Sequence, residues 1–238
     1  MRVLRKILCS INKRKNILLG NGFSVKKSYG CKWLIDWSNS VDKKVAYKLF
    51  ENKQISFFLK KIETDNPEYF FDIGAHGGLY SIIFKKRFDH LKILSFEPDR
   101  QNRYQMLSNL FLNKLENKIK VYDFGLSSDT KEVYFDIKSI NNRGEKRITN
   151  DGNYKISVKP LDEVFLKKNK NCFMKIDVEG HEKDVILGSK KILKTNRCLI
   201  QVEILDENNF QDFDNLMKSI GYTLIKKIDD YYYSNYII

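Results

Sequence analysis

One short segment constrains the fold of this chain more than any other, because an apolar run leads through a glycine turn into a helical pattern. The run Tyr69–Ile73 is followed by Gly74, Gly77 and Gly78, and apolar residues then recur at helical spacing over Leu79–Arg87. Glycines allow the backbone to turn sharply and let a ligand approach it closely. The N-terminus of the following helix offers free N–H groups. The segment therefore predicts a strand, a tight turn and a helix that together bind a ligand.

A second turn of the same kind follows along the chain. The apolar run Leu91–Phe96 ends in Glu97, roughly twenty residues after the first turn, and a carboxylate at this position can accept hydrogen bonds from both hydroxyls of a ribose. The carboxyl ends of parallel strands share one edge of a sheet. The two turns together predict a nucleoside-containing cofactor that lies across adjacent strand ends.

The glycine spacing distinguishes between two such cofactors. A G-x-G-x-x-G dinucleotide motif that starts at Gly74 needs glycine at positions 76 and 79, where this chain has His76 and Leu79, so an NAD-linked oxidoreductase is excluded. The carboxylate of Asp72 at the strand end disfavours a pyrophosphate and favours a cationic sulfonium and ammonium. We therefore predict that the cofactor is S-adenosylmethionine. The predicted cofactor-binding residues are Asp72, Gly74, His76, Gly78, Glu97, Asp123 and Phe124, the last as a packing surface for adenine.

Three separated motifs resemble those of the FkbM-type S-adenosylmethionine-dependent methyltransferases. They are Asp72–Gly78, Phe96–Pro98 and Phe173–Glu182, and the resemblance extends over about Val45–Leu205. The family pattern usually has asparagine where this chain has His76. The resemblance implies a class I methyltransferase fold and methyl transfer to oxygen, often on sugars or secondary metabolites.

The alternation of apolar runs and helical patterns predicts an α/β fold. With the resemblance, we expect a Rossmann-like, mainly parallel seven-stranded sheet with helices on both faces and an antiparallel last strand. A hairpin or mobile loop is expected within Val133–Val158. We expect a basic N-terminal extension over residues 1–40 and a single methyltransferase domain over residues 41–238. The predicted core strands are Tyr69–Ile73, Lys92–Phe96, Lys118–Phe124, Cys172–Asp177 and Cys198–Ile204, and the helices Leu79–Arg87, Arg100–Asn113, Glu182–Ile192 and Asn208–Ser219.

The positive charge is concentrated near the N-terminus. Nine lysines and arginines and no acid precede Asp36, and removing them from the net charge of +13 leaves +4 for the remainder. Apolar residues at helical spacing within residues 1–15 are typical of a helix that lies on an anionic membrane, although a solvated extension has the same pattern. No apolar run approaches the ~20 residues of a membrane span. The chain has no C-x-x-C pair, and Cys172 and Cys198 each open a predicted core strand, so we expect buried free thiols. Free thiols are typical of the cytoplasm, and we expect a cytoplasmic protein, with membrane association through residues 1–15 as the alternative.

The candidate catalytic residues Asp177, Glu179 and His181 follow the fourth predicted core strand. Methyl transfer to oxygen requires a group that takes the hydroxyl proton, and imidazole titrates near neutral pH, which makes His181 a candidate base. A packing or capping role is the alternative for this histidine. Asp177 and Glu203 end neighbouring predicted strands and could bind Mg²⁺, or they could simply bind the substrate.

Two other functions fit the sequence less well. Enzymes that methylate nucleic-acid bases carry an Asn/Asp-Pro-Pro-aromatic motif, but the three prolines of this chain are isolated and Asp177–Glu179 is acidic, so no specific nucleic-acid partner is expected. A catalytically inactive binding module is disfavoured by the intact set of Asp72, Glu97 and Asp177. We expect an O-methyltransferase with a sugar, nucleotide-sugar or glycan acceptor. The alternatives are another small metabolite, a lipid or RNA. The sequence makes no prediction of the oligomeric state.

Overall fold

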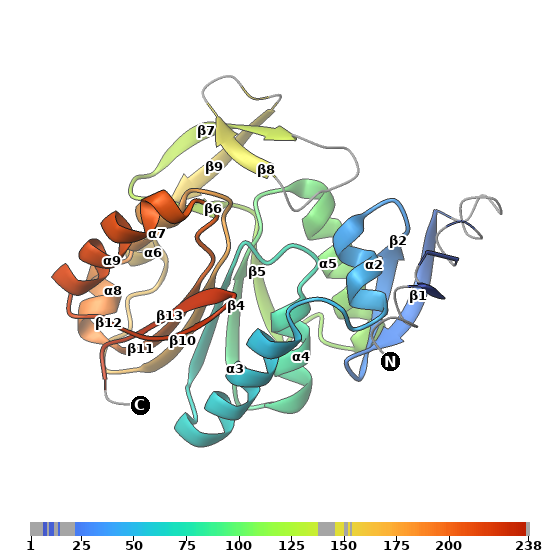
Figure 1. Cartoon of the computed structure of the whole chain (residues 1–238), viewed down its shortest axis with the longest axis horizontal. Helices are drawn as coiled ribbons and strands as arrows, with labels where there is room; N and C mark the ends of the chain where they lie inside the picture. Colours follow the sequence, from blue (N-terminus) through green and yellow to red (C-terminus); the bar gives the residue numbers. More distant parts are fainter. Residues whose placement is uncertain are drawn as a thin grey trace.

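The computed structural model describes residues 7–8, 10–11, 14, 22–137, 146–149, 152 and 154–236. A central sheet lies between two layers of helices, with a hairpin at one side and a small second sheet above its upper edge in the view of Figure 1. The amphipathic segment predicted over residues 1–15 falls mostly outside the described residues, and its membrane contact stays a prediction.

The central sheet has the strand order β12-β13-β11-β10-β3-β4-β5. Its core strands β11, β10, β3, β4 and β5 run parallel, and β13 is antiparallel to both of its neighbours, β11 and β12. This confirms the predicted α/β fold with an antiparallel last strand. The bounds are β3 (Tyr69–Ile73), β4 (Lys92–Phe96), β5 (Ile119–Tyr122), β10 (Asn171–Ile176), β11 (Arg197–Val202), β12 (Thr223–Ile228) and β13 (Asp230–Ser234).

Helices cover both faces of this sheet because successive strand residues point to opposite sides. Phe70, Phe173 and Leu199 pack with one set of helices, whereas their neighbours Phe71 and Met174 pack with the other. The first set is α3 (Asn52–Asp65), α4 (Leu79–Arg87) and α5 (Arg100–Asn113). The second set is α6 (Leu161–Val164), α7 (Glu182–Leu187), α8 (Lys190–Thr195) and α9 (Phe210–Ser219), which follows the short 3₁₀ helix η1 (Glu207–Asn209).

None of the described helices is long and apolar enough to cross a membrane.

The helix predicted over Glu182–Ile192 is two helices in the structure, and the break falls at Gly188. A Cβ on Gly188 would lie 1.9 Å from the carbonyl oxygen of Ser127. This position must therefore be glycine for the break between the two helices to pack against the backbone at Ser127. Ahead of β3 the chain forms two helices, α2 (Ser40–Ala46) and α3.

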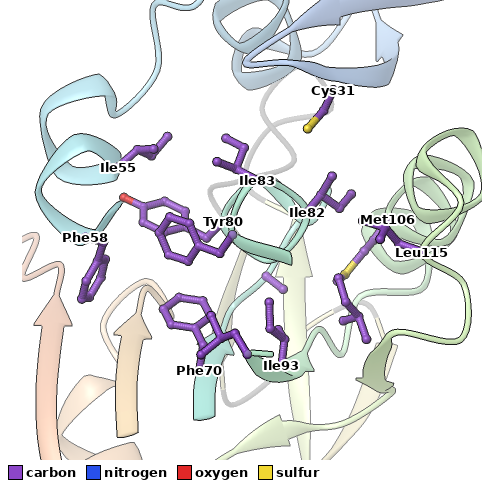
Figure 2. Close-up of a cluster of buried hydrophobic side chains, with 14 of the residues drawn as sticks. Cys31, Ile55, Phe58, Phe70, Tyr80, Ile82, Ile83, Ile93, Met106 and Leu115 are labelled. Carbon is purple, nitrogen blue, oxygen red and sulfur yellow. The ribbon is translucent and has the colours of Figure 1, made fainter. Parts of the chain in front are cut away.

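Aromatic rings dominate the core between the sheet and the first set of helices (Figure 2). Phe58 of α3 makes edge-to-face contacts with Phe70, Tyr80 and Phe84, at centroid distances of 5.8, 6.3 and 6.0 Å. Edge-to-face pairs contribute about 0.5–1.5 kcal/mol beyond the burial of their area. On the other face, Cys172 and Cys198 are buried free thiols at paired positions, as predicted.

The N-terminal hairpin is held on the domain by amide side chains of α5. The hairpin consists of β1 (Phe23–Ser28) and β2 (Cys31–Asp36). The Lys32 N–H donates to Asn113 at 2.9 Å, the Leu34 N–H donates to Asn109 at 2.7 Å, and Gln105 donates to the Leu34 carbonyl at 2.8 Å. These side chains replace the neighbouring strand that the free edge of β2 would otherwise need.

The hairpin also contributes side chains to the hydrophobic core. Trp33, Ile35 and Trp37 are buried in the same cluster as Phe58, although the sequence places them in an extension that ends at residue 40. These three side chains therefore belong to the packed core. The sequence missed this because the partners of the hairpin lie far along the chain.

A second sheet of four strands, in the order β6-β9-β7-β8, occupies the segment predicted as a hairpin or mobile loop (Figure 1). The Tyr154 hydroxyl in β9 donates a hydrogen bond to Asp99, which joins this sheet to the turn after β4. The bounds are β6 (Gly125–Leu126), β7 (Lys131–Ile137), β8 (Lys146–Thr149) and β9 (Tyr154–Lys159).

Candidate active site

A cavity of about 1030 Å³ lies at the carboxyl ends of the central strands. Segments of α2, α3 and the four-stranded sheet also contribute to its wall. The structure brings most of the predicted site residues together here and leaves three outside the lining. Those that line the cavity are Asp72, Gly74, His76, Glu97, Asp177, Glu179, His181 and Glu203, and those that do not are Gly78, Asp123 and Phe124.

The turn after β3 requires glycine at position 74. Gly74 has φ 77°, and a Cβ there would lie 1.8 Å from the carbonyl oxygen of Asp177. The N–H groups of Gly74 and Ala75 both donate to the Phe96 carbonyl, at 3.0 and 3.1 Å. Gly74 therefore lets the turn lie directly against the loop that follows β10.

Gly78 serves packing and does not line the cavity. It precedes α4 with φ 82°, and a Cβ there would lie 2.9 Å from Cγ of Met106 in α5. The motif glycine predicted to contact the cofactor is thus explained by the close approach of two helices.

Glu97 is held in place by backbone donors. Its Oε2 accepts from the His76 N–H at 2.7 Å, its Oε1 accepts from the Asp99 N–H at 2.9 Å, and the residue is 5% exposed. A carboxylate oxygen can accept more than one hydrogen bond, which is the property that binding of a ribose diol requires. His76 adopts a left-handed conformation with φ 48°, which directs its N–H at this carboxylate.

Asp123 and Phe124 follow the end of β5 outside the cavity lining, and the adenine contact of Phe124 stays a prediction. The Phe124 ring packs 5.9 Å from Phe96 and 5.1 Å from Tyr122, and the Lys159 ammonium lies 5.1 Å from its centroid. The predicted strand ended at Phe124, whereas β5 ends at Tyr122. Gly125 and Leu126 line the cavity in this region instead.

Asp72 is 1% exposed, and it anchors the first turn of α4. Its Oδ2 accepts from the Ser81 hydroxyl at 2.5 Å and from the Ser81 N–H at 3.2 Å. Burial raises the pKa of Asp72, whereas Lys175 and the bonds from Ser81 oppose this shift. Asp72 therefore orients the glycine turn as well as lining the cavity.

Sequence reasoning missed a buried ion pair at the floor of the cavity. Lys175 Nζ lies 2.7 Å from Asp177 Oδ2, and the two side chains are 7% and 22% exposed. Burial by itself lowers the pKa of Lys175, but Asp177, Glu51 and Asp72 raise it well above the ordinary value. The signal was a lysine inside the otherwise apolar run Phe173–Ile176, since a buried charge in a central strand needs a partner.

Three further carboxyls surround this ion pair. Burial raises the pKa of Glu51 to about 7 and that of Asp230 to about 6. Burial and the adjacent Asp177 raise the pKa of Glu203 to about 9, so Glu203 is protonated at neutral pH and donates a hydrogen bond to Asp177. Burial favours neutral Asp177, but Lys175 and this bond lower its pKa below the ordinary value.

The Mg²⁺ option receives no support. Asp177 and Glu203 do lie side by side, as their strand ends predicted, but they share a hydrogen bond and the Lys175 ammonium already lies beside them. Across the part of the chain that the structure describes, no three His, Cys, Asp or Glu side chains form a group suited to a metal ion.

His181 is engaged at both ring nitrogens. Its Nε2 lies 2.9 Å from the Ser127 hydroxyl, and its Nδ1 lies 3.4 Å from Asp184 Oδ2. Burial lowers the pKa of His181. These contacts favour the packing role over the base role, because His181 joins the loop after β10 to β6. Glu179 lines the cavity on the same loop, with φ 55°.

The strand order and the paired turns at Gly74 and Glu97 define a class I methyltransferase fold. The family model of the methyltransferase FkbM domain matches residues 72–224, and the chain belongs to this family.

Three of the individual proteins that this chain resembles share between 16% and 34% of its residues over the matched segments. Hexuronic acid methyltransferase AglP of Haloferax volcanii is 25% identical over 156 residues, which is 65% of this chain and 62% of that protein. Methyltransferase sdnD of Sordaria araneosa is 34% identical over 96 residues, 36% of each chain. The crystal structure of methyltransferase FkbM from Methylobacillus flagellatus matches with a TM-score of 0.52 at 16% identity, over 98% of this chain and 60% of that one. The chain spans less than two thirds of the length of each relative.

Proposed function

We propose that this protein transfers a methyl group from S-adenosylmethionine to a hydroxyl of a sugar, nucleotide-sugar or glycan. The observation that carries the proposal is the pairing of the Gly74 turn with the Glu97 carboxylate at the edge of one large cavity. The name of the Haloferax relative favours a sugar acceptor.

The cavity residues fit this methyl donor. Glu97 would accept from its ribose hydroxyls, and its amino-acid portion would lie along the Gly74 turn, which lines the cavity. The carboxyls of Asp72 and Asp177 complement its positive sulfonium and ammonium groups. The donor supplies an electrophilic methyl carbon, and the protein supplies orientation and charge.

Asp177 is the group best placed to assist the transfer. The acceptor oxygen forms a bond to the methyl carbon while the carbon–sulfur bond breaks, and the electron pair of that bond stays on sulfur. The hydroxyl proton passes to Asp177, which Lys175 keeps ionised at neutral pH. Alignment of the oxygen with the methyl group is itself a large contribution to the rate.

The proposal is tested with a labelled methyl donor and a panel of sugars, nucleotide-sugars and glycans. We expect label to reach at least one acceptor, and Asp177→Asn to lower turnover by about 100-fold or more while the donor still binds. Asp212→Asn, at an exposed carboxyl on α9, is the matched control and should retain wild-type turnover. Equal turnover in wild type and Asp177→Asn would contradict the role of Asp177.

A further inference from the structure

Four carboxyl groups line one end of the cavity. Glu51 precedes α3, Asp177 follows β10, Glu203 follows β11, and Asp230 begins β13, so separate parts of the chain contribute. All four line the cavity next to Lys175. This end lies away from Glu97, on the side of the sheet where β10, β11 and β13 are neighbours.

Neutral donors fix the directions of two of these carboxyls. The Tyr80 hydroxyl donates to Glu51 Oε2 at 2.5 Å, and Gln201 Nε2 donates to Asp230 Oδ2. Gln201 Nε2 also lies 3.1 Å from the Tyr80 oxygen, which links the two pairs. In Figure 2 the Tyr80 hydroxyl points toward α3, the helix that Glu51 precedes. The carboxyls are therefore held in place and do not move freely in solvent.

Asp177 and Glu203 also lie in hydrogen-bond contact at this end of the cavity. Two carboxyl groups form a hydrogen bond with each other only when they share a proton, and the buried ammonium of Lys175 lies beside this pair. A ligand that brings positive charge to this end would be stabilised, whereas a ligand that brings a carboxylate or phosphate would be repelled.

We infer that the sugar methylated in this cavity is an amino sugar, with a free ammonium group close to the reacting hydroxyl. The inference rests on the proposed function, and it names the acceptor class for the same site. The hydroxyl of the amino sugar reaches Asp177, and the ammonium of the same sugar faces Glu51 and Asp230. A uronate in the same position would face these carboxyls with a like charge, which is a common means of rejecting a wrong substrate.

The test compares three methyl glycosides that share one hexose frame: the glucosaminide with an ammonium, the neutral glucoside and the glucuronide with a carboxylate. Methyl transfer is measured at pH 7 with saturating donor. We expect kcat/KM to be highest for the glucosaminide and at least about tenfold lower for the glucuronide. Raising the salt concentration should lower the ratio of kcat/KM for the glucosaminide to kcat/KM for the glucuronide. Salt screens the charges that discriminate between the two substrates, whereas discrimination by shape does not depend on salt.

Asp230→Asn provides a second readout, namely the ratio of kcat/KM for glucosaminide over glucoside, which a general loss of activity does not change. We expect this ratio to fall in the variant. A glucuronide that is methylated as well as or better than the glucosaminide would overturn the inference, as would a failure to methylate any of the three while the donor binds. Absence of donor binding by calorimetry would instead contradict the proposed function.

Discussion

Lys175 Nζ lies 2.7 Å from Asp177 Oδ2 at the carboxyl end of β10, where the cavity meets the centre of the sheet. Lys175 pairs in register with Asp72 on one side and with Gln201 on the other. One ammonium is thus placed among the carboxyls that line the cavity, and the ionised state of Asp177 depends on it.

We predict that Lys175→Met destabilises the protein by about 3–5 kcal/mol, because it leaves buried carboxylates without their partner. Lys168→Met, at an exposed lysine, should change the stability by less than about 0.5 kcal/mol. Midpoints of urea unfolding measure both. Lys175→Arg retains the positive charge and should lose less than Lys175→Met. An equal loss in these two variants would contradict the electrostatic role.

Glu203 predicts a specific pH dependence of stability. Its pKa is raised from 4.5 to about 9, so the folded state holds a proton that the unfolded state releases in this range. The stabilisation is therefore complete below about pH 4.5 and is lost as the pH rises toward 9. Glu203→Gln retains a hydrogen-bond donor without the titration. We expect the difference in unfolding free energy between wild type and this variant to decrease as the pH rises from about 4.5 to about 9. A difference that does not change with pH would show that the pKa of Glu203 is ordinary.

Glu97→Ala should raise the Kd for S-adenosylmethionine by at least about tenfold, because hydrogen bonds to a charged group contribute about 1.5–3 kcal/mol. Asp123→Ala is the matched control, since the sequence predicts this residue as a cofactor ligand but the structure leaves it outside the cavity lining. Its Kd should change by less than about threefold. Isothermal titration calorimetry measures both values, and a larger effect of Asp123→Ala would reverse our assignment.

Tyr154→Phe should weaken donor binding although Tyr154 is expected to make no contact with the donor. Its hydroxyl donates to Asp99, whose N–H donates to Glu97 and whose Oδ1 accepts from the Asn102 N–H at the start of α5. Loss of the first bond frees the turn that positions Glu97. Tyr134→Phe, at a tyrosine of the same sheet that is 41% exposed, should bind the donor like wild type. The same titration compares the two, and identical Kd values would exclude a positioning role for Tyr154.

The sequence predicted the central elements well because each has a local signal. Strands β3 and β4 and helices α4 and α5 have the predicted bounds. The apolar run of β3 ends at a glycine turn, that of β4 ends at Glu97, and Asp99 caps α5. Interactions between distant segments left no such signal. The amides of α5 bond the edge of β2, and Glu51 and Asp230 meet Lys175 only after folding. At Gly78 the glycine pattern alone does not distinguish ligand contact from helix packing, because both require glycine.

The most direct test of the account is a crystal structure with S-adenosylmethionine bound. We expect the ribose hydroxyls within hydrogen-bond distance of Glu97, the amino-acid portion beside Gly74, and the methyl group directed toward Asp177. A donor bound elsewhere, or bound with its ribose away from Glu97, would contradict the central claim.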